Sequence, residues 1–301
     1  MHFAVLALIV TNIVWGASSP IFKWAMEDIP PYSFAFLRFL LAALILLPFT
    51  LHKLKVRRED IIKLCILAFF GFFIHIALLL VGLTISSSIN SPIIASSAPV
   101  FLLLGSFFFL KEKIKKKMLI GTLVSLLGVM IIILRPLFDH GLDGTIIGNF
   151  LFLVSTISFV VYTILLKDYK LPYSSVTLTF YMFALSTIIF LPFSLWELQT
   201  QSNALILSSQ SLLGILFAAI FTSVLGYVLY NYAIRFVKAN ETGIFLYIDP
   251  VIAVLIAVPL LGEHVTTSFI IGSILVFAGI FIAEKRIHYH PLHHLKKPHS
   301  L

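Results

Sequence analysis

Long apolar stretches joined by short polar segments constrain the fold of this chain more than any other feature. A helix needs roughly 20 apolar residues to cross a hydrocarbon core of about 30 Å, and ten stretches reach or approach that length. They are Phe3–Phe22, Tyr32–Leu51, Ile62–Ile85, Ser88–Leu110, Met118–Leu134, Thr145–Leu166, Ser174–Leu195, Ser211–Tyr232, Thr242–Leu261 and Val265–Ala283. With 60% hydrophobic residues and a mean hydropathy of +1.07, the chain is too apolar to bury them in a soluble core. We therefore predict an all-α integral membrane protein with ten transmembrane helices.

The N-terminal stretch and the single cysteine narrow the alternatives. The first residues carry neither the basic head nor the small-residue cleavage site of a signal peptide, so Phe3–Phe22 is predicted to remain as a spanning helix. Cys65 is the only cysteine, which excludes disulfide frameworks and cysteine-based metal sites. Between the third and fourth stretches, Ser86–Ser91 leaves room for no more than a tight turn.

Lys and Arg residues sort onto one side of the membrane. With the N-terminus inside, eighteen of the 21 lie in inner loops or the C-terminal tail, while Lys23 and Arg135 lie outside and Arg38 lies within a helix. The positive-inside rule therefore places both termini in the cytoplasm. Topology then accounts for the formal net charge of +8, and no nucleic-acid partner is expected.

Four landmark residues recur at a constant spacing of 151 positions. The pairs are Pro99 and Pro250, Glu112 and Glu263, Gly121 and Gly272, and Gly128 and Gly279. We predict two five-helix repeats, residues 1–136 and 145–284, followed by a tail rich in His and Lys, residues 285–301. An odd number of helices inserts the second copy upside down. The charges agree, because the lysine-rich loop Lys111–Lys117 matches Gly262–Thr267, which has no Lys or Arg.

Inverted repeats have a physical use in transport. Two similar packings, one open to each side of the membrane, lie close in energy, so one half can rock against the other and expose a central site alternately. The alternative is a duplication that builds a stable bundle and transports nothing.

Several of these landmarks also carry a family resemblance, which covers Phe3 to about Glu284 and both repeats. The residues are Trp15-Gly16, Arg38, Pro99, Glu112, Asp249-Pro250, Gly262-Glu263 and the two glycine pairs. The chain resembles the EamA-domain branch of the drug/metabolite transporter superfamily. The resemblance implies a ten-helix carrier of the inner or plasma membrane, in a family with several exporters of amino acids and other metabolites. It further implies a cavity lined by the first, third, fourth, sixth, eighth and ninth helices. Asp249 departs from the pattern, since the family often has Glu before the Pro.

Asp249 is the candidate for ion coupling. At about 1.5 Å per residue it lies roughly 10 Å from the inner end of the ninth stretch, and Pro250 leaves the carbonyl of Leu246 without its usual amide partner. A carboxylate beside a free carbonyl favours a cation, an amine or a proton. The alternatives are an ion pair with Arg235 or Lys238, or a protonated Asp buried without a function.

Seven residues are candidates for substrate binding. They are Asn12, Trp15, Ser96, Ser97, Tyr162, Tyr227 and Tyr247. Tyrosine rings can stack on an aromatic or amine-bearing solute while their hydroxyls bond it, and a buried Asn amide needs a partner in lipid. The competing roles are helix packing for the two serines and interfacial anchoring for the tyrosines.

Arg38 and His75 lie at similar depths in the outer half of the membrane. Arg38 is about 9 Å from the outer end of its helix. It is assigned a structural role, snorkelling outward with help from Glu263, and anion binding is the alternative. The depths of Arg38 and Asp249 differ by about 11 Å, which argues against a direct ion pair. His75 is a candidate proton relay, with a hydrogen-bonded packing role as the alternative.

The repeated landmarks are assigned structural roles. Glu112 and Glu263 follow helix ends, where each can bind the backbone amides that open the next helix and act as a hinge. Pro99 and Pro250 mark matching positions of their helices. The glycines Gly121, Gly128, Gly272 and Gly279 recur on one helix face, and they allow close contact within a repeat or across a homodimer.

Motifs for other chemistry are missing from the sequence. The histidines of the tail lie among lysines and prolines, which predicts a disordered cytoplasmic segment rather than a metal site. No Gly-rich phosphate loop, HExxH or GxSxG pattern occurs, so we expect neither ATP-driven pumping nor an enzyme, and no cofactor.

These features together predict a secondary active transporter of small metabolites that works by alternating access. An exporter of an amino acid or amine, coupled to protons through Asp249, is the leading hypothesis. The alternatives are a facilitated carrier of sugar or nucleotide-like solutes and a membrane scaffold that transports nothing.

Overall fold

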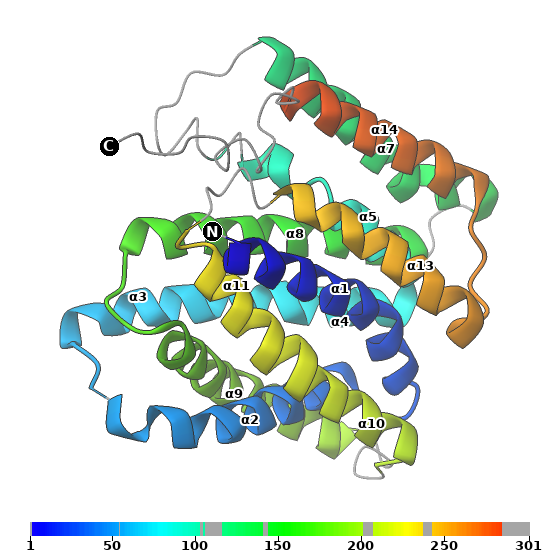
Figure 1. The fold of residues 1–301 in the computed structure, drawn as a ribbon. Coiled ribbons are helices and arrows are strands. Elements are labelled where there is room, and N and C mark those ends of the chain that lie inside the picture. Colours follow the sequence, from blue (N-terminus) through cyan, green and yellow to red (C-terminus); the bar gives the residue numbers. More distant parts are fainter. Residues whose placement is uncertain are drawn as a thin grey trace, which may run out of the picture.

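A computed structural model describes residues 2–53, 55–102, 105, 116–140, 144–200, 207–236 and 243–284. Within these ranges the chain forms helices and turns and contains no strand (Figure 1). Three features of the sequence lie outside them: Glu112, Lys238 and the tail after residue 284.

The helices follow the apolar stretches closely. In chain order they are α1 (His2–Ala25), α2 (Pro31–Thr50), η1 (Leu51–Lys53), α3 (Arg58–Ala68), η2 (Phe69–Ile74), α4 (His75–Ile85), α5 (Asn90–Ala95), α7 (Lys116–His140), α8 (Gly144–Tyr169), α9 (Ser175–Thr200), α10 (Ser209–Phe217), η3 (Ala218–Tyr227), α11 (Val228–Ala233), η4 (Gly243–Tyr247), α13 (Ile248–Leu261) and α14 (Thr267–Glu284). Proline begins α2, where its missing N–H costs nothing. Gly262 ends α13 in the left-handed conformation, with φ of 64°.

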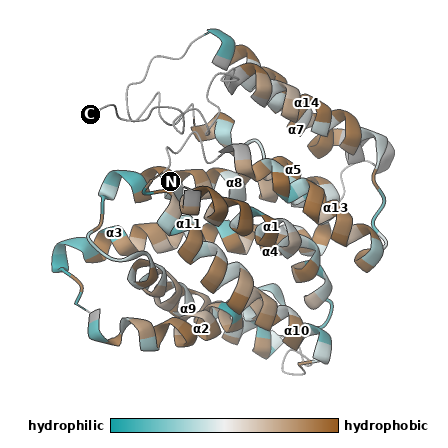
Figure 2. Ribbon diagram, viewed as in Figure 1, coloured by the Kyte–Doolittle hydropathy of each residue, from teal (hydrophilic) through white to brown (hydrophobic). Residues whose placement is uncertain are grey.

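Six helical segments among the described residues are long and apolar enough to cross a membrane. They are Phe3–Ala25, Pro31–Thr50, Arg58–Ile85, Thr145–Tyr169, Ser175–Thr200 and Ser209–Ala233, and shorter apolar helices cover Leu119–Leu134, Phe245–Leu261 and Thr267–Gly279. Apolar residues cover the helices and polar ones gather near their ends (Figure 2). Phe49 and Ile62 are each 72% exposed, which suits a surface that faces lipid rather than water.

Helices of the first half of the chain pair with helices of the second half. α7 packs along α14, and α2 packs along α9. α1 lies against α13, and α8 lies against both α4 and α5 (Figure 1). The halves therefore form one interlocked bundle.

The helix faces that carry Gly121, Gly128, Gly272 and Gly279 pack against each other in the contact between α7 and α14. A Cβ atom at Gly128 would lie 2.5 Å from the backbone oxygen of Gly272, and one at Gly272 would lie 2.8 Å from that of Gly128. Gly279 approaches Gly121 in the same way. The contact thus joins the two halves of one chain, not helices within a repeat. These glycines no longer argue for a homodimer.

The third and eighth stretches are interrupted by π-helical turns. η2 lies between α3 and α4, and η3 lies between α10 and α11. The sequence predicted continuous helices here, because neither stretch contains a proline. A π turn widens the helix locally, and such turns are frequent at functional sites.

Candidate functional site

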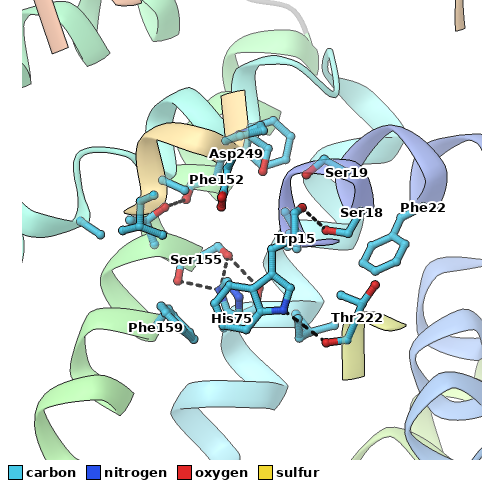
Figure 3. A pocket seen from close by; sticks show the side chains of 18 of the residues that line it. Trp15, Ser18, Ser19, Phe22, His75, Phe152, Ser155, Phe159, Thr222 and Asp249 are labelled. Carbon is cyan, nitrogen blue, oxygen red and sulfur yellow. Dashed lines mark hydrogen bonds between the residues drawn. The ribbon is translucent and has the colours of Figure 1, made fainter. Parts of the chain in front are cut away.

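A pocket lies at the centre of the bundle (Figure 3). The volume of the pocket is about 730 Å³, including the part that is open to solvent. The lining residues are Trp15, Ser18, Ser19, Phe22, Arg38, His75, Ile76, Leu79, Ser91, Pro92, Ala95, Ala98, Phe152, Ser155, Thr156, Phe159, Thr222, Tyr227, Leu246 and Asp249. They come from the six helices that the family resemblance implies and, in addition, from α2 through Arg38. Among the residues whose side chains the structure describes, none from α7 or α14 lines it.

Trp15 forms one wall of the pocket. Its indole Nε1 donates a hydrogen bond of 3.2 Å to the carbonyl of Thr222 in η3. The ring packs edge-on against Phe159 and lies 5.1 Å from the ring of Tyr227, centroid to centroid. The hydrogen bond and the two ring contacts hold the indole, so the aromatic surface is preformed.

Asp249 enters the pocket from the first turn of α13 (Figure 3). The Leu246 carbonyl, whose amide partner Pro250 removes, accepts a hydrogen bond of 3.3 Å from the hydroxyl of Ser96. Gly16 of α1 packs directly on this turn, since a Cβ there would lie 2.7 Å from the Asp249 backbone oxygen. Asp249 is 7% exposed, and its Oδ1 atom has no hydrogen-bond partner among the described residues.

Arg38 is buried rather than snorkelling outward, which corrects the expected position. Its side chain is 1% exposed, and Nε donates a 2.7 Å hydrogen bond to the hydroxyl of Ser223. The guanidinium lies 4.8 Å from the ring centre of Phe22 and 5.0 Å from that of Phe39. Its Nη1 atom has no hydrogen-bond partner among the described residues. A buried donor without a partner is costly, so this group is available for an anion.

His75 and Ser155 form a compact pair on the pocket wall. The Ser155 hydroxyl lies 2.8 Å from His75 Nδ1 and 2.8 Å from the His75 carbonyl. The His75 ring also packs on Phe159, with ring centres 5.0 Å apart. Nδ1 is therefore engaged by α8, and the opposite edge of the imidazole carries Nε2.

Five predicted binding residues do not line the pocket. Among the described residues, the hydroxyl of Ser97, in the turn that follows α5, donates to the carbonyl of Ile94, while the Ser96 hydroxyl donates to the carbonyl of Leu246. Tyr162 donates to Asn231 Oδ1 at 2.8 Å, below the aromatic wall, and Tyr247 packs against Phe277. Asn12 donates to the carbonyl of Leu8, and its Oδ1 atom is buried without a partner in the described part of the chain.

Several lining residues were missed by sequence reasoning. Ser18 and Ser19 lie one turn beyond Trp15 on α1, and Ser91 lies at the start of α5. Their spacing of three to four from Trp15 was the available signal, because residues at that spacing share a helix face. Ser91 had no comparable signal.

Glu263 binds a different helix start from the one expected. Its carboxylate accepts hydrogen bonds from the Ser88 amide at 2.8 Å, the Ile89 amide at 3.2 Å and the Ser87 hydroxyl at 2.7 Å. Lys23 completes the set with a 2.9 Å ion pair. Glu263 therefore caps α5 in the other half of the chain rather than the adjacent α14. Burial alone would raise the pKa of Glu263, but these hydrogen bonds and Lys23 outweigh it and lower that pKa below its usual value.

In the part of the chain that the structure describes, no three His, Cys, Asp or Glu side chains gather as a metal site would need. The pocket instead offers one guanidinium, one carboxyl group, small hydroxyls and aromatic walls. Such a mixture suits a small organic solute with polar groups.

A multi-pass helical membrane protein with a mostly apolar pocket that also contains a few polar groups is the class that this fold and site define. The chain belongs to the EamA-like transporter family, whose model matches residues 2–134 and 146–284. It is therefore a membrane transporter of a small-molecule substrate and not an enzyme.

Curated relatives span nearly the whole chain. An uncharacterized transporter of Archaeoglobus fulgidus is 27% identical over 286 residues, covering 94% of this chain and 98% of the relative. The uncharacterized transporter YetK of Bacillus subtilis is 31% identical over 290 residues, covering 93% and 86%. A solved crystal structure matches with a TM-score of 0.66 at 14% identity, covering 95% of this chain and 99% of that one, which establishes likeness of fold alone.

Proposed function

We propose that this protein is a secondary carrier of a small zwitterionic metabolite, an amino acid or a close analogue that keeps both charged groups. The single observation that supports this substrate class is the presence, in one pocket, of two buried groups of opposite type with an unsatisfied atom each: Arg38 Nη1 and Asp249 Oδ1. In this proposal Arg38 binds the carboxylate of the solute and Asp249 binds its ammonium group.

The pocket walls favour an apolar or aromatic side chain on the solute. Trp15, Phe22 and Phe159 line the space around the two polar anchors. A neutral sugar would pair with neither charge, and a simple amine would leave Arg38 unsatisfied. Each buried donor left unpaired costs about 1–3 kcal/mol, or roughly five- to 150-fold in affinity.

We also propose that transport proceeds by alternating access between two inverted halves, residues 1–136 and 145–284. The matched contacts between halves support this proposal, since α2 and α9 are equivalent helices, as are α7 and α14. The contact of α1 with α13 likewise corresponds to that of α8 with α5. The distribution of Lys and Arg supports a cell-membrane protein with both termini in the cytoplasm, and export is the proposed direction.

Proton coupling is assigned to Asp249. A buried carboxyl group that must bind either a proton or the ammonium group of the solute exchanges one for the other. Outward movement of solute would then be driven by inward movement of a proton. Asp249→Asn should lose accumulation driven by a pH gradient, and any remaining exchange of labelled for unlabelled solute should require a higher solute concentration because the ammonium group has lost its carboxylate partner.

Counterflow in proteoliposomes tests the substrate class. Matched probes are phenylalanine, phenethylamine, which lacks the carboxylate, and 3-phenylpropionate, which lacks the amine, beside the other common amino acids and glucose. We expect saturable counterflow of at least one amino acid, with its decarboxylated and deaminated analogues at least about tenfold poorer. Arg38→Gln should remove the preference for the amino acid over the amine. The proposal fails if no amino acid shows saturable flux.

A further inference from the structure

The two π-helical turns occupy matching places in the two halves of the chain. η2 covers Phe69–Ile74 and η3 covers Ala218–Tyr227, so a shift of 151 positions superposes them. In a π turn the regular ladder of backbone hydrogen bonds is interrupted, and its carbonyls become available to other donors. Each turn lies beside pocket residues: His75 follows η2, and Thr222 and Tyr227 belong to η3.

Side chains of α8 bind the carbonyls around η2. The Ser158 hydroxyl donates to the carbonyl of Phe70 at 2.7 Å. One turn earlier on the same helix, the Ser155 hydroxyl reaches the carbonyl of His75 at 2.8 Å.

Side chains of α1 bind the carbonyls of η3 in the same way. Trp15 Nε1 donates to the carbonyl of Thr222 at 3.2 Å, and the Thr11 hydroxyl donates to that of Gly226 at 3.3 Å. The acceptors correspond between the halves, because Gly226 lies 151 positions after His75 and Thr222 lies 152 after Phe70. α1 and α8 are themselves equivalent helices of the two repeats.

Each π turn also contains a glycine on which an aromatic ring of the same partner helix packs. The ring of Tyr162 from α8 lies against Gly71, where a Cβ would overlap it. The indole of Trp15 from α1 lies against Gly226, where a Cβ would lie 2.6 Å from Nε1. Both turns thus combine carbonyls that accept side-chain hydrogen bonds, two donors from the neighbouring helix and a backbone surface without a side chain.

We propose that η2 and η3 are a matched pair of joints on which the pocket walls move, and that Thr11 and Ser158 are positioning residues that hold them. Each donor bond is worth only about 1 kcal/mol, so a carbonyl can pass between the side chain of α1 or α8 and a backbone amide of its own helix. That exchange converts a π turn to a regular α turn, which changes the bend of the helix and moves His75 or Tyr227. The role in transport rests on the proposed alternating access.

Spin-label distances across η2 test the joint without any solute. One pair uses the native, exposed Cys65 of α3 and Thr84→Cys on α4, which lie on either side of η2. The comparison pair, Phe150→Cys and Asp168→Cys in a Cys65→Ala background, spans a similar length of the uninterrupted α8. We expect the η2 pair to give a distance distribution at least about twofold broader than the α8 pair. Ser158→Ala should shift the distance distribution of the η2 pair away from the one measured without this substitution.

The kinetics of counterflow then distinguish a joint that moves during transport from a contact that only packs. Neither Ser158 nor Thr11 lines the pocket, so Ser158→Ala and Thr11→Val should change the maximal rate of counterflow at least about threefold, an activation difference of about 0.7 kcal/mol, with half-saturation unchanged. Ser158→Thr, which keeps a hydroxyl, should restore the rate. Thr187→Val, whose hydroxyl bonds only the Phe183 carbonyl of its own helix, is the control and should leave both parameters unchanged.

Equal widths for the two spin-label pairs, with no response to Ser158→Ala, would overturn the inference even if transport is found. A broad η2 distribution that responds to Ser158→Ala supports the joint even if no probe is carried, and in that case only the proposed function fails. If Ser158→Ala does not fold, amide hydrogen exchange of the wild-type protein decides the matter. Residues 69–74 and 218–227 must then exchange faster than the helices on either side of them.

Discussion

The pocket differs from the contact of Glu263 with Lys23 and Ser87–Ile89, called the junction below, in how its charged side chains are paired. At the junction, the carboxylate of Glu263 has four donors within 3.2 Å, from Lys23, Ser87, Ser88 and Ile89. In the pocket, Asp249 Oδ1 has no donor and Arg38 Nη1 has no acceptor among the described residues. A charge with a full set of partners stabilises the fold, whereas a charge without them is held in readiness for a partner from outside. The difference separates residues that hold the fold together from those that we propose bind the solute.

The largest expected effect compares the two carboxylates directly. Glu263→Ala leaves two backbone amides and Lys23 without their acceptor and should cost about 3 kcal/mol of stability. Asp249→Ala removes a group with an unsatisfied atom, so it should leave stability unchanged or raise it while abolishing transport. Thermal unfolding in detergent, followed by tryptophan fluorescence, measures both. Equal losses of stability in the two variants would erase the distinction between junction and pocket.

A smaller loss is expected from the glycine contact between α7 and α14, which is also fully packed. Gly128→Ala places a Cβ against the Gly272 backbone, and overpacking of this kind costs about 1–3 kcal/mol. Leu127→Ala is the neighbouring control, because Leu127 is exposed on the outer face of α7. A thermal shift no larger in Gly128→Ala than in Leu127→Ala would show that the two helices can separate freely.

The Glu263 contacts also predict that stability depends on pH. The pKa of Glu263 is lower in the folded protein than its ordinary value of 4.5, so the unfolded chain binds more protons as the pH falls. The stability that Glu263 contributes is complete above about pH 4.5 and disappears as the pH drops through the folded pKa. Unfolding temperatures of wild type and Glu263→Gln should therefore differ at pH 7 and converge on acidification. A difference that stays constant down to pH 3 would argue against a charged Glu263 at the junction.

The smallest effect is expected from a predicted binding residue that lies outside the pocket. Ser97 bonds only within its own turn, so Ser97→Ala should change neither the half-saturation nor the maximal rate of counterflow. Ser91→Ala is the matched comparison, because Ser91 lines the pocket. This variant should need a higher solute concentration for half-saturation. If Ser97→Ala raised the concentration at half-saturation as much as Ser91→Ala does, the boundary of the pocket would need revision.

Sequence reasoning identified the helical stretch that carries each candidate residue but not the side of the helix that the residue faces. Hydropathy and the Asp249-Pro250 pair placed the carboxyl group on the ninth stretch, and the carbonyl freed at Leu246 indeed finds a hydroxyl donor in Ser96. Arg38 was assigned to the outer surface because counting residues gives a height in the membrane but not the side of the helix that a residue faces. Glu263 was assigned to the adjacent helix for a related reason, since the chain does not reveal that α5 starts beside it.

The π turns lay beyond prediction for a different physical reason. Phe69–Ile74 reads as an ordinary apolar helix, and its widened turn is held by hydroxyls of α8 that are distant in sequence. Gly71 and Gly226 were the local hints, each a residue without a side chain in the middle of a long helix. Such a glycine indicates a close helix contact only once the helix that packs on it is known.

Ligand-dependent unfolding of the purified protein tests most directly the claim that the unpaired groups of the pocket await a zwitterion. A solute that binds only the folded state raises the unfolding temperature, and the effect grows with the ratio of solute concentration to Kd. The assay requires neither a gradient nor a transport direction. With each amino acid beside its decarboxylated and deaminated analogues, we predict that at least one amino acid stabilises the wild type and that both analogues fail. We further predict that Arg38→Gln and Asp249→Asn each lose the effect, while Ser97→Ala keeps it. Stabilisation by glucose or by a simple amine that persists in both variants would contradict the claim.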